Sequence, residues 1–251
     1  MRTSGLGMGI QGFGDKVGNF MRSNFLAAER RVSASVVCLI ASIGGLIFAA
    51  ESYTTDLNAV VDGLQKRYAS VHTVTGAFQQ TYRAPGIDQV ESGVFRMKRP
   101  GFMRWEYRQP EEKLFIADGR EAFLYVPQDR QVTVQPFSNT DMRGTPLELL
   151  LGGAEIRKSF SVSWETQLKP TAGQMALIRL IPRSAGEVYE SLVLEVDPKS
   201  FDLRRIVIRE HGGTTSEFLL TNLAVNVKMG NKEFQFKIPK GVEVVRMNSE
   251  E

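Results

Sequence analysis

The chain has 251 residues, of which 42% are hydrophobic, 24% charged and 9% aromatic, a composition typical of a folded protein rather than a disordered or fibrous one. Its 31 Lys and Arg residues against 28 Asp and Glu residues give a net charge of +3, which is too balanced for a dedicated nucleic-acid binder. It has 2 His and 1 Cys, which argues against a zinc framework, excludes an intramolecular disulfide and lowers the expectation of an enzyme.

Residues 1–52 have the pattern of a targeting segment. An uncharged apolar run at 32–50 follows Arg30 and Arg31 and ends in small residues, which is the order of parts in a secretory signal. We therefore expect an N-terminal extension and a signal peptide at 1–52. The alternative is a retained membrane anchor, because the run is just long enough to span a bilayer. The single cysteine, Cys38, follows Val37, a neighbour that does not favour lipoprotein attachment.

The remaining residues, 53–251, contain no change in composition that would mark a linker, so we expect one domain. It opens with a helix that Thr54 or Thr55 can cap. Apolar residues recur there with the 3.6-residue period of a helix: Leu57, Val60, Val61, Leu64 and Tyr68.

Further along the chain, apolar and polar residues alternate with the period of two that is typical of strands. Between short segments of this kind stand turn signals such as Pro100-Gly101 and Asp118-Gly119. About ten or eleven short strands are expected, forming an extended antiparallel sheet that must curl. These ten or eleven strands are expected from twelve segments with strand character: 73–82, 93–98, 102–107, 114–117, 122–126, 131–135, 160–164, 175–181, 191–196, 203–209, 217–227 and 234–238.

In two of these strands the alternation separates large apolar residues from charged ones. Because successive side chains point to opposite faces, the sequence predicts one face with aromatic rings and methionines and another with charges. The apolar face would carry Phe95, Met97, Met103, Trp105 and Tyr107, and the other face Arg96, Lys98, Arg104 and Glu106. Such residues suit either an adaptable apolar cavity or an ordinary core.

A second, short helix is expected from the sequence Thr145-Pro146-Leu147-Glu148. Thr can cap it, Pro suits the first helical position, and Glu three residues after Thr completes a capping box. Gly152 and Gly153 would end this helix after a run of leucines.

No sequence motif indicates a catalytic, metal or cofactor site. The run from Gly7 to Gly12 matches the glycine-rich dinucleotide-binding motif, but that motif must follow a strand, and no strand can precede Gly7. His211-Gly212-Gly213 is similar to the oxyanion loop of some esterases, but the sequence lacks the Gly-x-Ser-x-Gly nucleophile elbow that accompanies such a loop. Basic and aromatic residues mix between Arg96 and Arg108, yet an amphipathic strand pair has the same pattern, so no nucleic acid is expected. An exported hydrolase that uses paired carboxylates remains the alternative from another class.

The ordered motifs of residues 55–247 resemble the LolA family of periplasmic carriers of outer-membrane lipoproteins. The closing segment with the pattern Phe-x-Phe-x-x-Pro-x-Gly-Val and the block from Lys98 to Trp105 are the most specific parts. The motifs are, in chain order, Gly76-Ala77-Phe78-Gln79-Gln80, Ser92-Gly93-Val94-Phe95, Lys98-Arg99-Pro100-Gly101-Phe102-Met103-Arg104-Trp105, Gln109-Pro110, Asp118-Gly119, Tyr125-Val126-Pro127, Gln131-Val132-Thr133-Val134, Thr145-Pro146 and the segment 234–242.

The resemblance implies a mainly β fold with an α lid: an unclosed antiparallel β-barrel covered by short helices. It also implies a non-enzymatic carrier, a monomer without cofactors, that works in the periplasm. Such a carrier accepts lipoproteins from an inner-membrane ABC transporter, shields their acyl chains and delivers them to an outer-membrane acceptor. The lipid-binding residues would be Phe95, Met97, Met103, Trp105, Tyr107, Phe123, Tyr125 and Leu149.

Arg99 matches the family's arginine that hydrogen-bonds the lid helices, so the resemblance implies that it couples lid position to cargo. The alternative for Arg99 is a surface charge at a strand end. Within the same fold, the alternative function is a carrier or sensor of another lipid or glycolipid.

Overall fold

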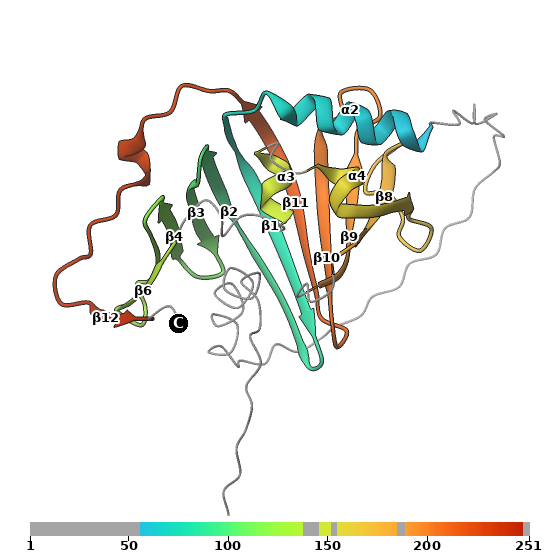
Figure 1. The fold of residues 1–251 in the computed structure, drawn as a ribbon. Helices are drawn as coiled ribbons and strands as arrows, with labels where there is room; N and C mark the ends of the chain where they lie inside the picture. The colour runs from blue at the N-terminus through green and yellow to red at the C-terminus, as the bar shows by residue number, and fades with distance from the viewer. Residues whose placement is uncertain (1–55, 138–145, 152–154, 185–188, 248–251) are drawn as a thin grey trace, which may run out of the picture.

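The computed structural model describes residues 56–137, 146–151, 155–184 and 189–247 (Figure 1). The extension and signal expected at 1–52 lie outside the described residues. Within the described part, no helix is both long and apolar enough to cross a membrane.

The strands form a single 12-stranded sheet. Its order is β12-β6-β5-β4-β3-β2-β1-β11-β10-β9-β8-β7, so β12 and β7 are the two edges and the sheet is not closed. The strands are β1 (Thr73–Ala84), β2 (Ile87–Lys98), β3 (Phe102–Gln109), β4 (Lys113–Asp118), β5 (Glu121–Val126), β6 (Gln131–Pro136), β7 (Phe160–Trp164), β8 (Ala176–Pro182), β9 (Tyr189–Val196), β10 (Leu203–Glu210), β11 (Thr215–Val225) and β12 (Glu243–Arg246).

This architecture confirms the predicted mainly β fold, an unclosed sheet with short helices, and it differs in detail at the C-terminus. The sheet has 12 strands rather than ten or eleven, and β12 pairs with β6 in parallel, not antiparallel. The expected strand at 234–238 is wrong: a 3₁₀-helix, η2 (Asn231–Phe234), begins this region instead. The alternating pattern there has another cause, because Phe236 and Ile238 pack as apolar side chains against β4, β5 and β6 without adding a strand.

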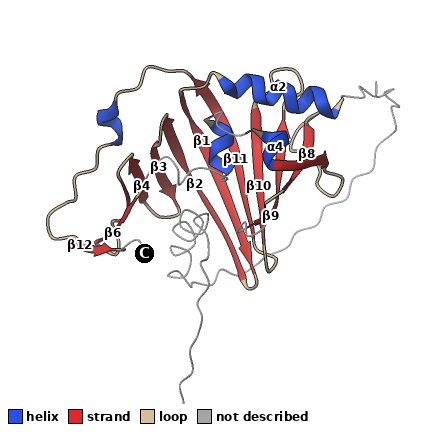
Figure 2. Cartoon of the chain, in the orientation of Figure 1, coloured by secondary structure: helices blue, strands red, loops and turns tan. Residues whose placement is uncertain are grey.

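The described helices α2 (Leu57–Ala69), α3 (Pro146–Leu150) and α4 (Ile156–Ser159) lie on one side of the sheet (Figure 2). The cap of α2 is Asp56, whose carboxylate accepts a hydrogen bond from the Asn58 backbone N–H at 3.1 Å; Thr54, Thr55 and Thr145 lie outside the described residues. α4 was not expected from the sequence, because four residues are too few to show a helical period.

The sheet has an inner face, which α2, α3 and α4 cover, and an outer face. The predicted separation of side chains in β2 and β3 is confirmed: Phe95 and Trp105 are buried on the inner face. On the outer face, Arg96 and Arg104 both donate to Glu106, at 2.9 and 2.6 Å. Further along the outer face, the C-terminal segment crosses β4, β5 and β6 and covers a smaller apolar cluster there.

A bulge where β2 meets β3 depends on Gly93. The register of the two strands shifts between Ser92 and Gly93, and a Cβ atom on Gly93 would lie 2.0 Å from the backbone oxygen of Glu106 and 3.0 Å from the Phe78 ring. A backbone carbonyl in the middle of a sheet cannot move aside cheaply, so only glycine fits at this position.

We expect Gly93→Ala to lower the free energy of unfolding by about 3 kcal/mol, near the upper end for overpacking. Gly230→Ala is the matched control, since a Cβ there meets nothing within 4 Å. Urea unfolding of both variants measures the difference. Equal stability of the two variants would contradict the assigned register of β2 and β3.

Candidate functional site

The inner face is a mainly apolar surface built by alternate residues of the strands. At its centre lies Trp105, which is 1% exposed. The Phe95 ring stacks on it at 4.8 Å between centroids, and the Phe78 ring meets it edge-on at 4.8 Å. The Phe218 ring of β11 also meets it edge-on, at 6.0 Å between centroids. Rings from β1, β2, β3 and β11 therefore form one aromatic floor.

The helices cover this floor with aliphatic side chains. α2 turns Val60, Val61 and Leu64 toward the sheet, and all three are buried. The end of α3 adds Leu149, Leu150 and Leu151, also buried in the same cluster. Because the floor would otherwise face water, these side chains supply most of the favourable free energy that holds the helices on the sheet.

Polar contacts fix α2 to the β9–β10 turn. The Arg67 guanidinium donates to Asp202 at 3.0 Å, and the Tyr68 hydroxyl accepts from the Leu203 backbone N–H at 3.1 Å. Gly63 leaves room for the Phe201 ring, since a Cβ there would lie 2.2 Å from that ring. The glycine that weakens the helix by its propensity thus lets the turn pack closely against it.

Arg157 of α4 fixes the other half of α2, although no sequence motif singles this arginine out. Its guanidinium donates to Asp62 at 2.9 and 3.1 Å, to the Asn58 side chain at 3.0 Å and to the Asn58 backbone oxygen at 3.2 Å. Asp62 and Asn58 lie four residues apart on α2, hence on one face. That spacing was the only signal that could have pointed to a shared partner.

Arg99, in the turn between β2 and β3, contacts two helices at once. Its Nε donates to the backbone oxygen of Leu151 at the end of α3, and its Nη2 donates to the oxygen of Ala69 at the end of α2, at 3.5 Å. Its own backbone N–H donates to the backbone oxygen of His72 at 2.9 Å. The two oxygens that accept from the guanidinium are carbonyls at helix ends, which lack partners within the helix and favour a positive charge.

Six of the eight sequence-predicted lipid-binding residues lie together on the inner face. Five come from β2 and β3 and one from α3. They are Phe95, Met97, Met103, Trp105, Tyr107 and Leu149.

The structure places the other two, Phe123 and Tyr125, on the outer face. Their rings lie 5.6 and 5.7 Å from that of Phe236 in the C-terminal segment. The register of β4 with β5 decides this: Leu124 pairs with Phe115, so Leu124 and Ala122 take the inner face instead. Alternation in a single strand states which residues share a face but not which face that is.

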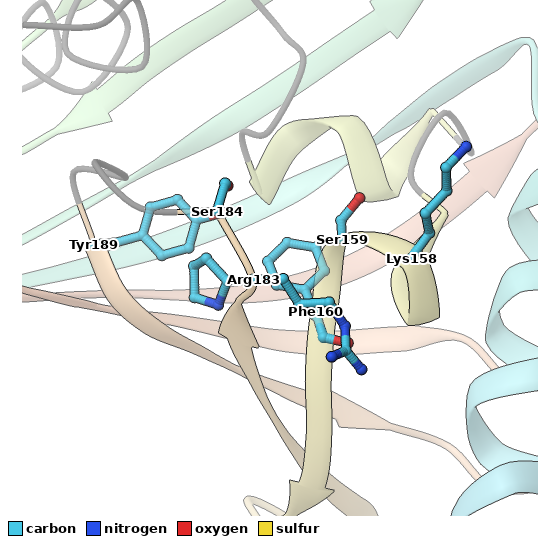
Figure 3. Close-up of a pocket in the computed structure, with 7 residues that line it drawn as sticks. Lys158, Ser159, Phe160, Arg183, Ser184 and Tyr189 are labelled. Carbon is cyan, nitrogen blue, oxygen red and sulfur yellow. The ribbon is translucent and has the colours of Figure 1, made fainter.

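A pocket of about 370 Å³ opens beside the helical cover (Figure 3). The rings of Phe160 and Tyr189 form part of its wall and also belong to the inner apolar cluster. Lys158 and Arg183 line it as well, and Arg183 donates through Nε to the backbone oxygen of Phe160 at 3.1 Å. The pocket thus joins apolar surface to cationic side chains.

Because different arginines hold α2 and the end of α3, we expect these two helices to open independently of each other. We expect Arg99→Leu to speed amide exchange of Leu149–Leu151 about tenfold, since hydrogen bonds of a charged donor contribute about 1.5 kcal/mol or more. α2 should change little, because Arg67 and Arg157 still hold it.

Arg157→Leu is the matched variant, and the opposite pattern is expected. Amide exchange should become faster in α2 and stay at the wild-type rate in Leu149–Leu151. Hydrogen-exchange mass spectrometry resolves the two segments. The same exchange profile in both variants would show that the helices open as one unit.

Comparison with known proteins places the chain among relatives of one kind. The family described as outer membrane lipoprotein carrier protein LolA matches residues 69–237. The outer-membrane lipoprotein carrier protein of Hahella chejuensis is 30% identical over 191 residues, which cover 75% of this chain and 88% of that protein. The protein of the same name from Bordetella avium is 31% identical over 196 residues, with 75% and 90% covered.

Among solved structures, a conserved protein from Thermus thermophilus is similar with a TM-score of 0.47 at 13% identity, covering 76% of this chain and 98% of that one. A LolA superfamily protein from Nitrosomonas europaea is similar with a TM-score of 0.37 at 9% identity, covering 71% and 97%. The assignment to a family rests on the sequence matches.

Proposed function

The chain belongs to the LolA family of outer-membrane lipoprotein carrier proteins, which are transport proteins and not enzymes, and from this membership we propose that it shields the acyl chains of lipoproteins on its inner face. The observation that carries the proposal is the buried apolar cluster of the inner face, in which the rings around Trp105 lie together with side chains of α2 and α3. The fatty chains would take the place of the helix side chains against this floor.

The energetics favour such an exchange. Each methylene taken out of water contributes about 0.8 kcal/mol, so three long acyl chains exposed to water would cost tens of kcal/mol. The floor itself must not face water when the carrier is empty, and Leu149, Leu150 and Leu151 meet that need. Replacing leucine side chains by acyl chains exchanges one apolar contact for another, so uptake and release can be nearly balanced.

The floor also suits chains of varied length and shape. Met97 and Met103 lie on the inner face beside the rings, and the unbranched methionine side chain adapts to irregular surfaces. Of the predicted lipid-binding residues, we retain Phe95, Met97, Met103, Trp105, Tyr107 and Leu149. Phe123 and Tyr125 are proposed instead to hold the C-terminal segment against the outer face.

Arg99 is proposed to couple the position of α3 to the presence of cargo. Its hydrogen bonds to Leu151 and Ala69 exist only while both helix ends lie near the β2–β3 turn. Cargo that lifts α3 breaks the bond to Leu151, and release of cargo restores it. The bond therefore favours the empty, covered state and helps to expel the cargo.

The cellular route follows from the family and from the sequence. We propose that residues 1–52 direct export and that 53–251 act in the periplasm as one carrier domain, a monomer. The donor would be an inner-membrane ABC transporter that releases lipoproteins, and the receiver an acceptor at the outer membrane.

The direct test is to purify the chain without detergent and to analyse bound molecules by mass spectrometry. We expect acylated protein or peptide to copurify, and a lipoprotein released from spheroplasts to remain soluble in its presence. Recovery of a glycolipid or another free lipid alone would favour the alternative within the same fold. Recovery of no acylated molecule, with no retained lipoprotein, would exclude both carrier functions.

We expect Arg99→Leu to fold normally, to accept lipoprotein and to deliver it poorly, because the covered state loses hydrogen bonds that contribute about 1–3 kcal/mol together. A transfer assay from the loaded carrier to outer-membrane vesicles measures the rate, expected to fall about tenfold or more. Arg246→Leu is the control, since Arg246 pairs with Glu121 at 3.1 Å, away from the helices. Wild-type delivery by Arg99→Leu would remove Arg99 from the coupling role.

A further inference from the structure

A group of polar side chains interrupts the apolar inner face where β1 to β4 lie farthest from the β2–β3 turn. Gln80, Glu91, Tyr107 and Lys113, which we call the inner polar cluster, come from four neighbouring strands. Lys113 and Glu91 form an ion pair with side chains only 9% and 8% exposed. The Tyr107 hydroxyl donates to the Gln80 side-chain oxygen at 3.2 Å, and the Lys113 ammonium lies 4.8 Å from the centre of the Tyr107 ring.

Folding alone gives little reason for this cluster. A buried ion pair loses the solvation of both charges, and apolar residues of the same size are often as stabilising or more so. Burial raises the pKa of Tyr107, and the negative charge of Glu91 raises it further, so the phenol stays protonated. The cluster thus keeps fixed donors and acceptors at a place where leucines would pack equally well.

Two buried polar atoms on this face lack a hydrogen-bond partner among the described residues. One is Oε2 of Glu91, an acceptor, and the other is Nε1 of Trp105, a donor. Trp105 lies two residues from Tyr107 on β3, so both side chains point to the same face. A buried polar atom without a partner costs about 1–3 kcal/mol, a cost that a bound ligand can remove.

We propose that the inner polar cluster and the Trp105 indole N–H form a subsite for the polar junction of an acylated ligand, the atoms where fatty chains meet amide and ester groups. An amide N–H of the junction would donate to Glu91 Oε2, and an ester or amide carbonyl would accept from Trp105 Nε1. The fatty chains would then lie on the apolar floor. This inference rests on the proposed function and adds to it a means of telling acyl esters and amides from plain hydrocarbon.

The test uses two probes with the full folded domain: a triacylated lipopeptide, and diphenylhexatriene, which is a hydrocarbon without polar atoms. The main variant is Glu91→Leu with Lys113→Leu, which removes both charges together and so leaves no unpaired one. Trp105→Phe keeps an aromatic ring and removes only the N–H donor. The control is Glu195→Leu with Arg205→Leu, a buried ion pair of the outer face whose side chains are 0% and 8% exposed.

We expect the Glu91/Lys113 variant to bind diphenylhexatriene as the wild type does and the lipopeptide at least tenfold more weakly, about the value of one hydrogen bond to a charged group. Trp105→Phe should weaken lipopeptide binding several-fold and the control variant should not. Undiminished lipopeptide binding by the Glu91/Lys113 variant would overturn the proposed subsite. If that variant does not fold, undiminished lipopeptide binding by Trp105→Phe would overturn it instead. A wild-type protein that binds diphenylhexatriene but no lipopeptide contradicts the proposed function itself.

Discussion

One face of a curled, open sheet is mainly apolar here, and no second sheet from the described residues packs against it. Such a face must be covered, because each exposed methylene costs about 0.8 kcal/mol. The chain solves this with α2 and α3, whose valines and leucines belong to the same buried cluster as the rings around Trp105. The cover is made of the same kind of surface as a lipid chain, so under the proposed function the interaction that completes the fold is also the one that a ligand replaces.

The polar contacts divide this cover into a fixed and a movable part. α2 is held along its length, by Arg157 at Asn58 and Asp62 and by the β9–β10 turn at Arg67. The end of α3 is held by the leucines and by the Arg99 bond to Leu151. A carrier needs both: a scaffold that keeps the floor intact, and a segment whose displacement costs only a few weak interactions.

Much of the inner face could be predicted because two strands carried the signal. The alternation from Phe95 to Tyr107 correctly separated rings and methionines from charges, since a strand has only two faces. The resemblance placed Phe123 and Tyr125 among the lipid-binding residues, but they lie on the outer face, because the choice of face depends on pairing with β4. The contacts of Arg157 and those within the inner polar cluster escaped prediction too, since their partners lie on other strands and helices.

The sequence by itself determined the class of fold, the periods of its elements and, through its ordered motifs, the family. These are local properties: a turn at Pro100-Gly101, a helical period from Leu57 to Tyr68, alternation in each strand. Only the tertiary structure decided which side of the sheet is inner, that β12 runs parallel to β6, and that Glu91 meets Lys113 on the inner face. Those facts depend on register and on long-range pairing, which no local pattern of residues encodes.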